Sequence, residues 1–303
     1  MKLPSYFKLY NSGELKKRAE ILHDILKSCK LCPHKCKVNR IDGQKGRCRS
    51  TAEPYVASHN AHFGEEPPIS GSRGSGTIFF ANCTLKCVFC QNYPISQMGN
   101  GRKVSNDELA EMFLNLQKRG CHNINFVTPT HYLSSIIDAL LIAIGKGFNL
   151  PIVYNTSGYE NVEILQLLDG IVDIYLPDIK YADDETAMRL SGAENYVAIN
   201  RAALKEMFRQ VGYLQCDEGI AVKGMIIRHL VLPNNFAGTE EAIKFIAEEL
   251  SPEVHFGLMS QYFPAHLAVN MDEINRRVKP LEYKPLIKLL GKYNMNNGWT
   301  QPL

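Results

Sequence analysis

Seven of the nine cysteines lie within 62 consecutive residues and form two sets with different spacing. The first set, Cys83, Cys87 and Cys90, follows the pattern C-x3-C-x2-C in the segment ANCTLKCVFCQNYPIS. Three thiolates on one loop can bind three irons of a cubane cluster and leave the fourth iron without a protein ligand. Structural zinc would need a fourth protein ligand, which Cys121 or a distant histidine would have to supply. The spacing therefore favours a [4Fe-4S] cluster with one open iron over zinc.

The second set consists of four cysteines in the segment CKLCPHKCKVNRIDGQKGRC, namely Cys29, Cys32, Cys36 and Cys48. Two of the cysteines are separated by two residues, and glycines let the chain turn back towards them before the fourth. The four thiolates can then complete a tetrahedral shell, so they indicate a bound metal. Structural zinc, a rubredoxin-like iron and an auxiliary [4Fe-4S] cluster all fit this pattern, and His34 could replace one thiolate. An auxiliary cluster could relay electrons or bind substrate, whereas zinc would mainly hold the loop. Cys121 and Cys216 are interpreted as ordinary thiols.

Composition and charge exclude several classes of protein. The chain has 303 residues, 45% hydrophobic and 21% charged, which is typical of a folded globular protein. The 34 basic and 31 acidic side chains are too evenly balanced to indicate binding to nucleic acid or a membrane surface. No signal peptide is evident, and the longest apolar run, near residues 136–144, is far short of the ~20 residues of a membrane span. We therefore expect a cytoplasmic protein, in which clustered thiols favour metal binding over a disulfide framework.

The elements that must position these residues alternate between strand and helix. Strands are predicted at 77–81, 124–127, 152–155, 172–176, 224–232 and 254–259, and helices near 14–26, 105–119, 132–146, 160–169, 199–211 and 239–250. This alternation predicts parallel βαβ units in a doubly wound sheet or a complete or partial barrel. An irregular Gly- and Pro-rich stretch at 64–76 is predicted to be loop. We expect an N-terminal helix with a cysteine-rich segment, residues 1–63, followed by an α/β domain, residues 64–303.

Polar or metal-binding residues follow all six predicted strands. They are the first cysteine set, Thr128–His131, Asn155–Gly158, Pro177–Lys180, His229 with residues 233–235, and Gln261–His266. In either architecture the carboxyl ends of parallel strands lie on one face, where such folds place their active sites. Helix caps and turns would explain one or two of these segments. Six of them together predict the rim of an active site.

The pattern C-x3-C-x-aromatic-C, with Phe89 in the aromatic position, resembles the cluster loop of the radical S-adenosylmethionine (SAM) enzymes. The wider stretch GEEPPISGSRGSGTIFFANCTLKCVFCQNYPIS resembles the subgroup related to the pyruvate formate-lyase activating enzyme, and the resemblance extends from Cys29 to about His266. It implies a partial (β/α)6 barrel, a [4Fe-4S] cluster on Cys83, Cys87 and Cys90, and SAM chelating the open iron. Reductive cleavage of SAM would yield methionine and a 5′-deoxyadenosyl radical that abstracts hydrogen from a substrate.

The chain departs from the family after the second predicted strand. The family has a Gly-Gly-Glu motif there that meets the methionine amino group of SAM, whereas this chain has TPTH. The hydroxyls of Thr128 and Thr130 can still accept hydrogen bonds from an ammonium. Among the histidines at strand ends, His131 is the candidate catalytic residue because it lies in the altered motif and could move a proton near neutral pH. For it, as for His229 and His266, a hydrogen-bonded core or rim histidine is the alternative.

Further SAM contacts follow from the resemblance. Asn155 and Ser157 match the region that reaches the ribose or carboxylate of SAM, although either could equally cap the next helix. Asp178 and Lys180 match the D-x-K of the activating-enzyme subgroup, which favours contact with cofactor or substrate over a purely structural ion pair. Arg228 matches a fifth-strand arginine of the subgroup.

The leading hypothesis is a radical SAM oxidoreductase that abstracts a hydrogen atom from a protein or a small molecule. A glycyl-radical enzyme as substrate, and a flavodoxin- or ferredoxin-type electron donor, are implied by the resemblance alone. The simplest activating-enzyme pattern lacks the second cysteine set. The alternative is a non-catalytic iron–sulfur or zinc protein for electron transfer or scaffolding, suggested by the missing Gly-Gly-Glu. A pure carrier, however, gains nothing from an open iron.

Overall fold

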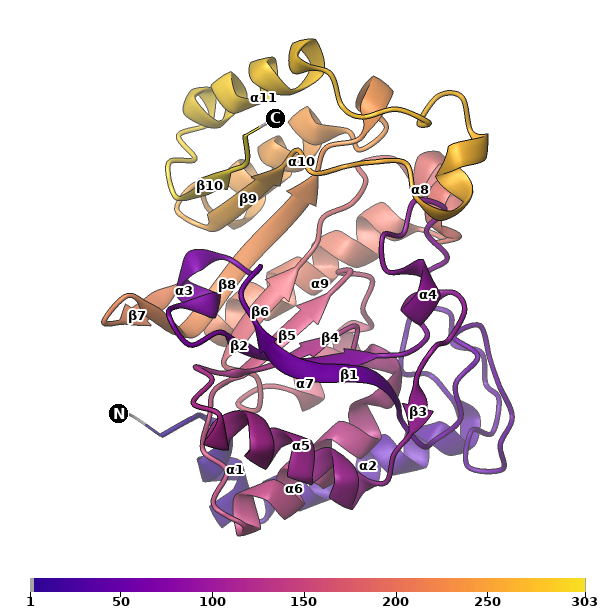
Figure 1. Cartoon of the computed structure of the whole chain (residues 1–303), viewed down its shortest axis with the longest axis vertical. Helices are drawn as coiled ribbons and strands as arrows, with labels where there is room; N and C mark the ends of the chain where they lie inside the picture. The colour runs from indigo at the N-terminus through magenta and orange to yellow at the C-terminus, as the bar shows by residue number, and fades with distance from the viewer. Residues whose placement is uncertain (1–2, 303) are drawn as a thin grey trace.

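The structure, a computed structural model, describes residues 3–302 and is built on one open sheet (Figure 1). The sheet has the order β10-β9-β8-β6-β5-β4-β2-β1-β3, with β7 paired to β8. The strands are β1 (Tyr55–His62), β2 (Ser75–Phe80), β3 (Arg102–Lys103), β4 (Ile124–Val127), β5 (Ile152–Thr156), β6 (Ile174–Pro177), β7 (Gln215–Asp217), β8 (Ile220–Leu230), β9 (His255–Met259) and β10 (Gly298–Thr300). Since the order does not return to its first strand, the sheet forms a partial barrel.

The six predicted strands correspond to β2, β4, β5, β6, β8 and β9, and neighbouring members of this group pair in parallel. The predicted α/β partial barrel is thus confirmed. Four strands were not predicted: β1 is antiparallel to β2, β10 is parallel to β9, and β3 and β7 are short. β10 and β7 have three residues each and β3 has two, which is too short for a periodic pattern to be recognised.

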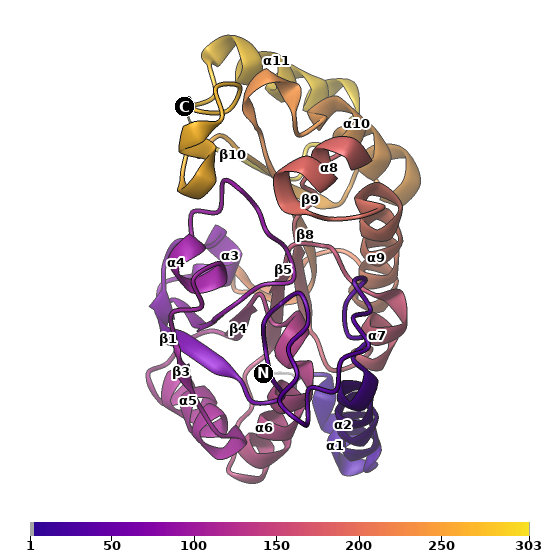
Figure 2. The ribbon, with the colours of Figure 1, turned by 90° about the vertical axis from the view of Figure 1, so that its right-hand side faces the viewer.

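Helices connect and cover the strands. They are α1 (Tyr6–Asn11), α2 (Glu14–Ile25), α3 (Pro67–Ser70), α4 (Tyr93–Ser96), α5 (Asn106–Lys118), α6 (Leu133–Gly145), α7 (Val162–Leu167), α8 (Asp184–Ser191), α9 (Tyr196–Val211), α10 (Thr239–Phe245) and α11 (Pro280–Lys292), with short turns at Leu26–Ser28, Thr130–Tyr132, Pro233–Asn235, Ile246–Leu250 and His266–Asn270. A capping box begins α5, because Ser105 Oγ accepts from Glu108 N–H at 3.1 Å and Glu108 Oε2 accepts from Ser105 N–H at 2.8 Å. Figure 2 shows α7 and α9 along one outer side of the sheet.

The first 63 residues are joined closely to the rest. Tyr6, Leu15 and Leu22 are buried in the same apolar core as the barrel helices, and α2 packs against α6. Residues 64–76, predicted to be loop, contain the one-turn helix α3 and the start of β2. A domain boundary at residue 64 therefore stays a prediction. Within residues 3–302 no helix has the length and apolar character needed to cross a bilayer.

Candidate active site

One cavity of about 510 Å³ lies where the parallel strands end. Its volume is in the range of sites for cofactors and drug-sized ligands. Ten of the predicted site residues line it: Cys83, Cys87, Phe89, Cys90, Thr128, Asn155, Ser157, Asp178, Lys180 and Arg228. The structure therefore gathers these residues from four strand ends and the cysteine loop around one space.

The loop that carries the first cysteine set is held by the end of α8. Its Lys86 N–H donates to Ser191 C=O at 2.9 Å and its Val88 N–H donates to Leu190 C=O at 2.8 Å. Phe89 is buried and meets the rings of Tyr181 and Tyr262 edge-on, with ring centroids 6.5 and 5.8 Å away. These contacts fix the loop backbone and leave the thiols facing the cavity.

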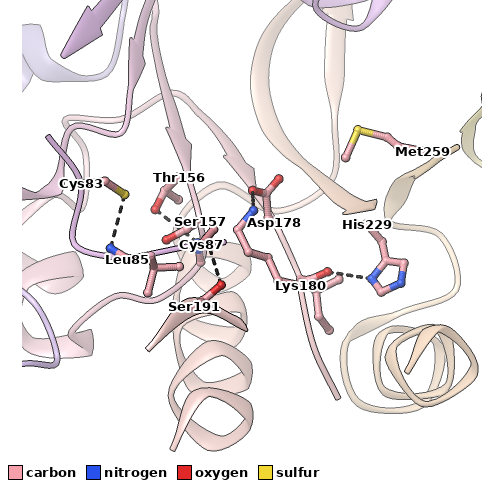
Figure 3. A network of polar contacts seen from close by, with 12 residues as sticks. Cys83, Leu85, Cys87, Thr156, Ser157, Asp178, Lys180, Ser191, His229 and Met259 are labelled. Carbon is pink, nitrogen blue, oxygen red and sulfur yellow. Dashed lines mark hydrogen bonds and ion pairs between the residues drawn. The ribbon is translucent and has the colours of Figure 1, made fainter. Parts of the chain in front are cut away.

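Each of the three thiols has a polar neighbour, and Figure 3 shows those of Cys83 and Cys87. Leu85 N–H donates to Cys83 Sγ at 3.4 Å, Ser191 O–H donates to Cys87 Sγ at 2.9 Å, and Cys90 Sγ lies 3.0 Å from a serine hydroxyl, Ser96 Oγ. Burial raises the pKa of the Cys83 thiol to about 12. A buried thiol of this kind ionises when a metal cation binds it, and donors that already face the sulfur stabilise the bound thiolate.

In the segment after β4, one threonine side chain lies at the cavity and another lies in the core. Thr128 lines the cavity with φ of 57°, a left-handed conformation that is strained for a β-branched residue. Thr130 does not line it. Its hydroxyl donates to the buried carboxylate of Glu160 at 2.6 Å, and the hydroxyl of Thr156 donates to the same oxygen. Burial raises the pKa of Glu160 to about 7. The sequence did not single out Glu160, since one acidic residue after a strand has no distinctive pattern.

Asn155 and Ser157, at the end of β5, lie at the cavity wall. The helix that follows, α7, has Asn161 as its N-cap residue, so neither Asn155 nor Ser157 caps it. Gly158 next to them has φ of 71°. A side chain there would overlap Asn200 and the backbone of Asp178, so this turn requires glycine.

Asp178 and Lys180 form an ion pair of 2.5 Å in which the two side chains are 22% and 19% exposed. Burial would lower the pKa of Lys180, but the charges of Asp178 and of a Cys87 thiolate outweigh it and raise the pKa. The pair is thus a preformed dipole at the cavity wall, beside Cys87.

Arg228 lines the cavity and is paired with two carboxylates. Its Nε donates to Glu66 Oε1 at 2.7 Å, and its Nη2 donates to Glu66 Oε2 at 2.6 Å and to Glu65. All three side chains are at most 13% exposed. The GEEPP segment carries part of the family resemblance, but no spacing in the sequence predicts this contact. Trp299, the single tryptophan of the chain, also reaches the cavity, from the unpredicted strand β10.

The three histidines predicted at strand ends do not line this cavity. His229 is fully buried with both ring nitrogens bonded, Nδ1 to Ile179 C=O at 2.7 Å (Figure 3) and Nε2 to Thr239 Oγ1 at 2.9 Å. His266 stacks on Tyr93 with ring centroids 5.0 Å apart. His131 lies instead beside the second cysteine set. A catalytic role for His131 stays a prediction, now without a position at the cavity to support it.

The second cysteine set surrounds a small space of its own. The cavity of about 10 Å³ is lined by Cys29, Leu31, Cys32, Cys36, Val38, Arg40, Gly46, Cys48 and His131. A side chain at Gly46 would overlap the Cys36 side chain, which explains a glycine there. His131 Nε2 donates to Ala81 C=O at 2.9 Å, whereas its buried Nδ1 has no partner among the described residues.

The guanidinium of Arg40 is buried beside these thiols. It donates to three carbonyls, those of Ser50 at 3.2 Å, Thr51 at 2.5 Å and His131 at 2.6 Å, and lies 3.9 Å from Cys29 Sγ. A buried cation surrounded by neutral groups is unfavourable unless negative charge is close. Thiolates bound to a metal are a source of such charge.

The second set touches the first cysteine loop. His34 Nε2 bonds to Thr84 C=O at 2.9 Å, so its ring is turned towards that loop, and Asn82 Nδ2 donates to Ser50 Oγ at 3.3 Å. Within residues 3–302, no three His, Cys, Asp or Glu side chains already stand as the coordination shell of a single ion. Metal binding by the second set is therefore a proposal based on residue chemistry and a shared cavity.

Comparisons with known proteins bear on the family of this chain. The Radical SAM superfamily model matches residues 77–246, more than half of the chain. An uncharacterized protein of Methanocaldococcus jannaschii is 36% identical over 289 residues, which cover 92% of this chain and 79% of that protein. The pyruvate formate-lyase-activating enzyme of Clostridium pasteurianum is 27% identical over 175 residues, which cover 56% of this chain and 66% of that enzyme.

Two solved structures have a similar arrangement at low sequence identity. Native anSMEcpe with bound AdoMet is 13% identical with a TM-score of 0.49, over 72% of this chain and 61% of that one. HydG, a maturase of the [FeFe]-hydrogenase, is 14% identical with a TM-score of 0.49, over 72% of this chain and 49% of HydG. The chain thus spans less than two thirds of either protein. TM-scores below 0.5 do not establish a common fold, so the assignment rests on the family match. On that match, the chain belongs to the Radical SAM superfamily.

Proposed function

We propose that this chain is a radical SAM oxidoreductase that cleaves SAM reductively and abstracts a hydrogen atom from its substrate. The observation that carries the proposal is the cavity shared by Cys83, Cys87 and Cys90 with polar residues from several strand ends. Three thiols on one loop leave one iron of a cubane open, and the adjoining space of about 510 Å³ suits a cofactor-sized ligand.

The three cysteines would hold the cluster, and the donors on their sulfurs fit that role. When bound, the cluster supplies the electron that splits SAM into methionine and the hydrogen-abstracting 5′-deoxyadenosyl radical. The protein then has to hold SAM in one orientation and keep water out. Buried Phe89 and Leu85 supply an apolar wall for this purpose.

The polar side chains at the cavity wall would bind SAM. Asp178 can accept hydrogen bonds from its ammonium or ribose hydroxyls, and Lys180 can donate to its carboxylate, as charge-assisted bonds. Asn155 and Ser157 offer uncharged partners. Arg228 keeps its Nη1 group, which has no hydrogen bond to the described residues, as a donor towards the same space.

The hydroxyl of Thr128 replaces part of the missing Gly-Gly-Glu in this proposal, because it lies at the cavity wall. Thr130 acts indirectly. By bonding to Glu160, which also holds Thr156, it orders the turn that presents Asn155 and Ser157.

For the substrate we favour a glycyl-radical protein, since an activating enzyme is among the relatives of this chain. A flavodoxin- or ferredoxin-type protein would supply the electron. The activase role predicts that anaerobic incubation with SAM and a glycyl-radical protein of the same organism gives a protein-based radical signal in electron paramagnetic resonance (EPR). Formation of 5′-deoxyadenosine without that signal would favour modification of another protein or of a small molecule.

The test of SAM cleavage is anaerobic reconstitution followed by dithionite and SAM. We expect 5′-deoxyadenosine and methionine from the wild type, and loss of both products to background in Cys87→Ala, because this thiol is one of only three cluster ligands. Cys216→Ala, which removes an exposed thiol, is the matched control and should keep full turnover. Turnover retained in Cys87→Ala would reject the cluster assignment.

We further propose that Cys29, Cys32, Cys36 and Cys48 bind a second metal centre, zinc or iron. The buried guanidinium of Arg40 and the unpartnered Nδ1 of His131 support it. Metal analysis should find about eight irons per chain, or about four irons with about one zinc or one further iron. The triple variant of Cys83, Cys87 and Cys90 to Ala should keep only the second metal. A triple variant without any metal would reject this site.

A further inference from the structure

The side chain of Lys86 lies in the loop between Cys83 and Cys87, and its ammonium group is buried. Within residues 3–302 this Nζ atom has no hydrogen-bond partner. Taking an ammonium out of water without a partner costs several kcal/mol. A negative charge is therefore needed next to Lys86, and the polypeptide alone does not supply it.

Lys86 lies where the two cysteine sets approach each other. Burial lowers the pKa of its ammonium group and the charges of Arg49 and Arg47 lower it further, whereas the Cys83 thiol of the first set and the Cys48 thiol of the second set raise it. The backbone brings the sets together here, through the bond from His34 to Thr84 C=O. Arg47 and Arg49 are exposed, so water and salt screen their charges, whereas the buried Lys86 ammonium group needs negative charge close to it.

A metal centre on each set would supply the missing negative charge. Four thiolates around one Zn²⁺, or around a [4Fe-4S] core, leave a net negative centre, and three thiolates on such a core do the same. A cation between the two centres is then attracted to both. It also reduces their mutual repulsion, which otherwise acts strongly in a medium of low dielectric constant.

We propose that Lys86 is a counter-charge shared by both metal centres and that it couples the second centre to the reduction potential of the first. The proposal rests on the proposed function, since it needs metal at both sets. Reduction of the first centre adds negative charge beside Lys86, so the ammonium favours the reduced form. The negative second centre opposes it. Charge that lies close to a cluster without binding it is a recognised determinant of the reduction potential of the cluster.

The test is the midpoint potential of the first centre, measured by EPR-monitored redox titration of the reconstituted full chain without SAM. In Lys86→Met we expect a more negative potential than in the wild type. Lys86→Arg, which keeps the charge, should stay near the wild-type value. Lys45→Met, the same change at an exposed lysine of the second-set loop, is the matched control and should not shift the potential. An unshifted potential in Lys86→Met would overturn the proposal.

Loss of the first cluster is also informative. If Lys86→Met loses its iron while Lys86→Arg keeps it, the charge is needed for cluster binding, which supports the proposal. If both variants lose it equally, the side chain is needed for its shape alone, and the counter-charge is rejected.

The coupling is tested through the second set. Cys32→Ser with Cys36→Ser should remove the second metal and shift the potential of the first centre to a more positive value. No shift, or no second metal in the wild type, would overturn the coupling. These readouts use metal content and potential, so they are independent of whether SAM is cleaved. Failure of 5′-deoxyadenosine formation with the expected shifts would reject only the proposed function.

Discussion

Glu160 accepts hydrogen bonds from the hydroxyls of Thr130 and Thr156 and is 2% exposed. Hydrogen bonds to the carboxylate favour its charged form, while burial favours the neutral form and prevails, so the pKa rises to about 7. The same side chain orders the turn behind the cavity wall. It therefore links the protonation of one residue to the shape of the candidate SAM site.

Glu160 should make stability depend on pH. Since its pKa is about 7 in the folded chain and near 4.5 ordinarily, the folded state keeps a proton that the unfolded state has lost between those values. The contribution of Glu160 to the free energy of unfolding is fully present below pH 4.5 and falls as the pH rises to 7. The expected fall is about 3 kcal/mol, since one pKa unit corresponds to ~1.4 kcal/mol. In Glu160→Gln this loss should be absent, as measured by urea denaturation at both pH values. The exposed Glu163→Gln should follow the wild type; parallel curves for wild type and Glu160→Gln would contradict the prediction.

The cysteines divide into two sets with different surroundings. The first set faces a cavity large enough for a cofactor, and the second surrounds a space of about 10 Å³. This difference agrees with an accessible centre and a closed one. It also places His131 with the closed centre, although the sequence associated it with the accessible one.

Turns between elements position the site more than the strands do. The turn after β5 holds Gly158 against Asn200 of α9, whose Nδ2 donates to Gly158 C=O at 3.1 Å and to Asp178 C=O at 3.0 Å. One amide therefore ties together the ends of β5 and β6. The residues that these ends present, Ser157 and Asp178, share the cavity as a result.

Gly158→Ala should disturb this tie. The added methyl would overlap Asn200 and Asp178 in a left-handed backbone, so we expect a loss of about 2–4 kcal/mol in the free energy of unfolding from strain and overpacking together. Gly13→Ala is the matched control, with a left-handed φ of 77° and no atom within 4 Å, and should cost only about 1–2 kcal/mol. Urea denaturation measures both. An equal cost for the two would show that the overlap at Gly158 is relieved without penalty.

Across the molecule, the ion pairs of Arg228 join the segment before β2 to β8, although Glu66 and Arg228 are 162 positions apart in the sequence. In the open sheet, β8 and β2 are separated by β6, β5 and β4. The curvature of the partial barrel lets the side chains meet over the cavity. The ion pairs thus close one side of the candidate site.

Removing this arginine should destabilise the whole fold. Arg228→Met leaves two buried carboxylates without their partner, and we expect a loss of about 3–5 kcal/mol in the free energy of unfolding. Arg102→Met is the control, because its pair with Glu108 is exposed and its loss should change stability far less. Chemical denaturation of both variants at neutral pH tests this. A small loss in Arg228→Met would mean that Glu65 and Glu66 reach water or take up protons.

The cysteine loop and the βα alternation were readable without coordinates because both are local properties. The spacing of Cys83, Cys87 and Cys90 sets the reach of three thiols on one loop, and hydrophobic periodicity sets the type of each element. Six parallel strands and a polar rim followed from these patterns. The short strand β10, and with it Trp299, carried no such pattern.

Side-chain direction and distant partners depended on the folded chain. Thr128 and Thr130 are two residues apart, yet one lines the cavity and the other bonds to Glu160, because the left-handed backbone at Thr128 turns the chain. Folding brings distant segments together to pair Arg228 with Glu65 and Glu66. It also brings the two cysteine sets close to each other beside Lys86. Local spacing determines which chemistry is present. Which groups share one cavity, and which charges are left without a partner, depends on long-range packing that no local pattern encodes.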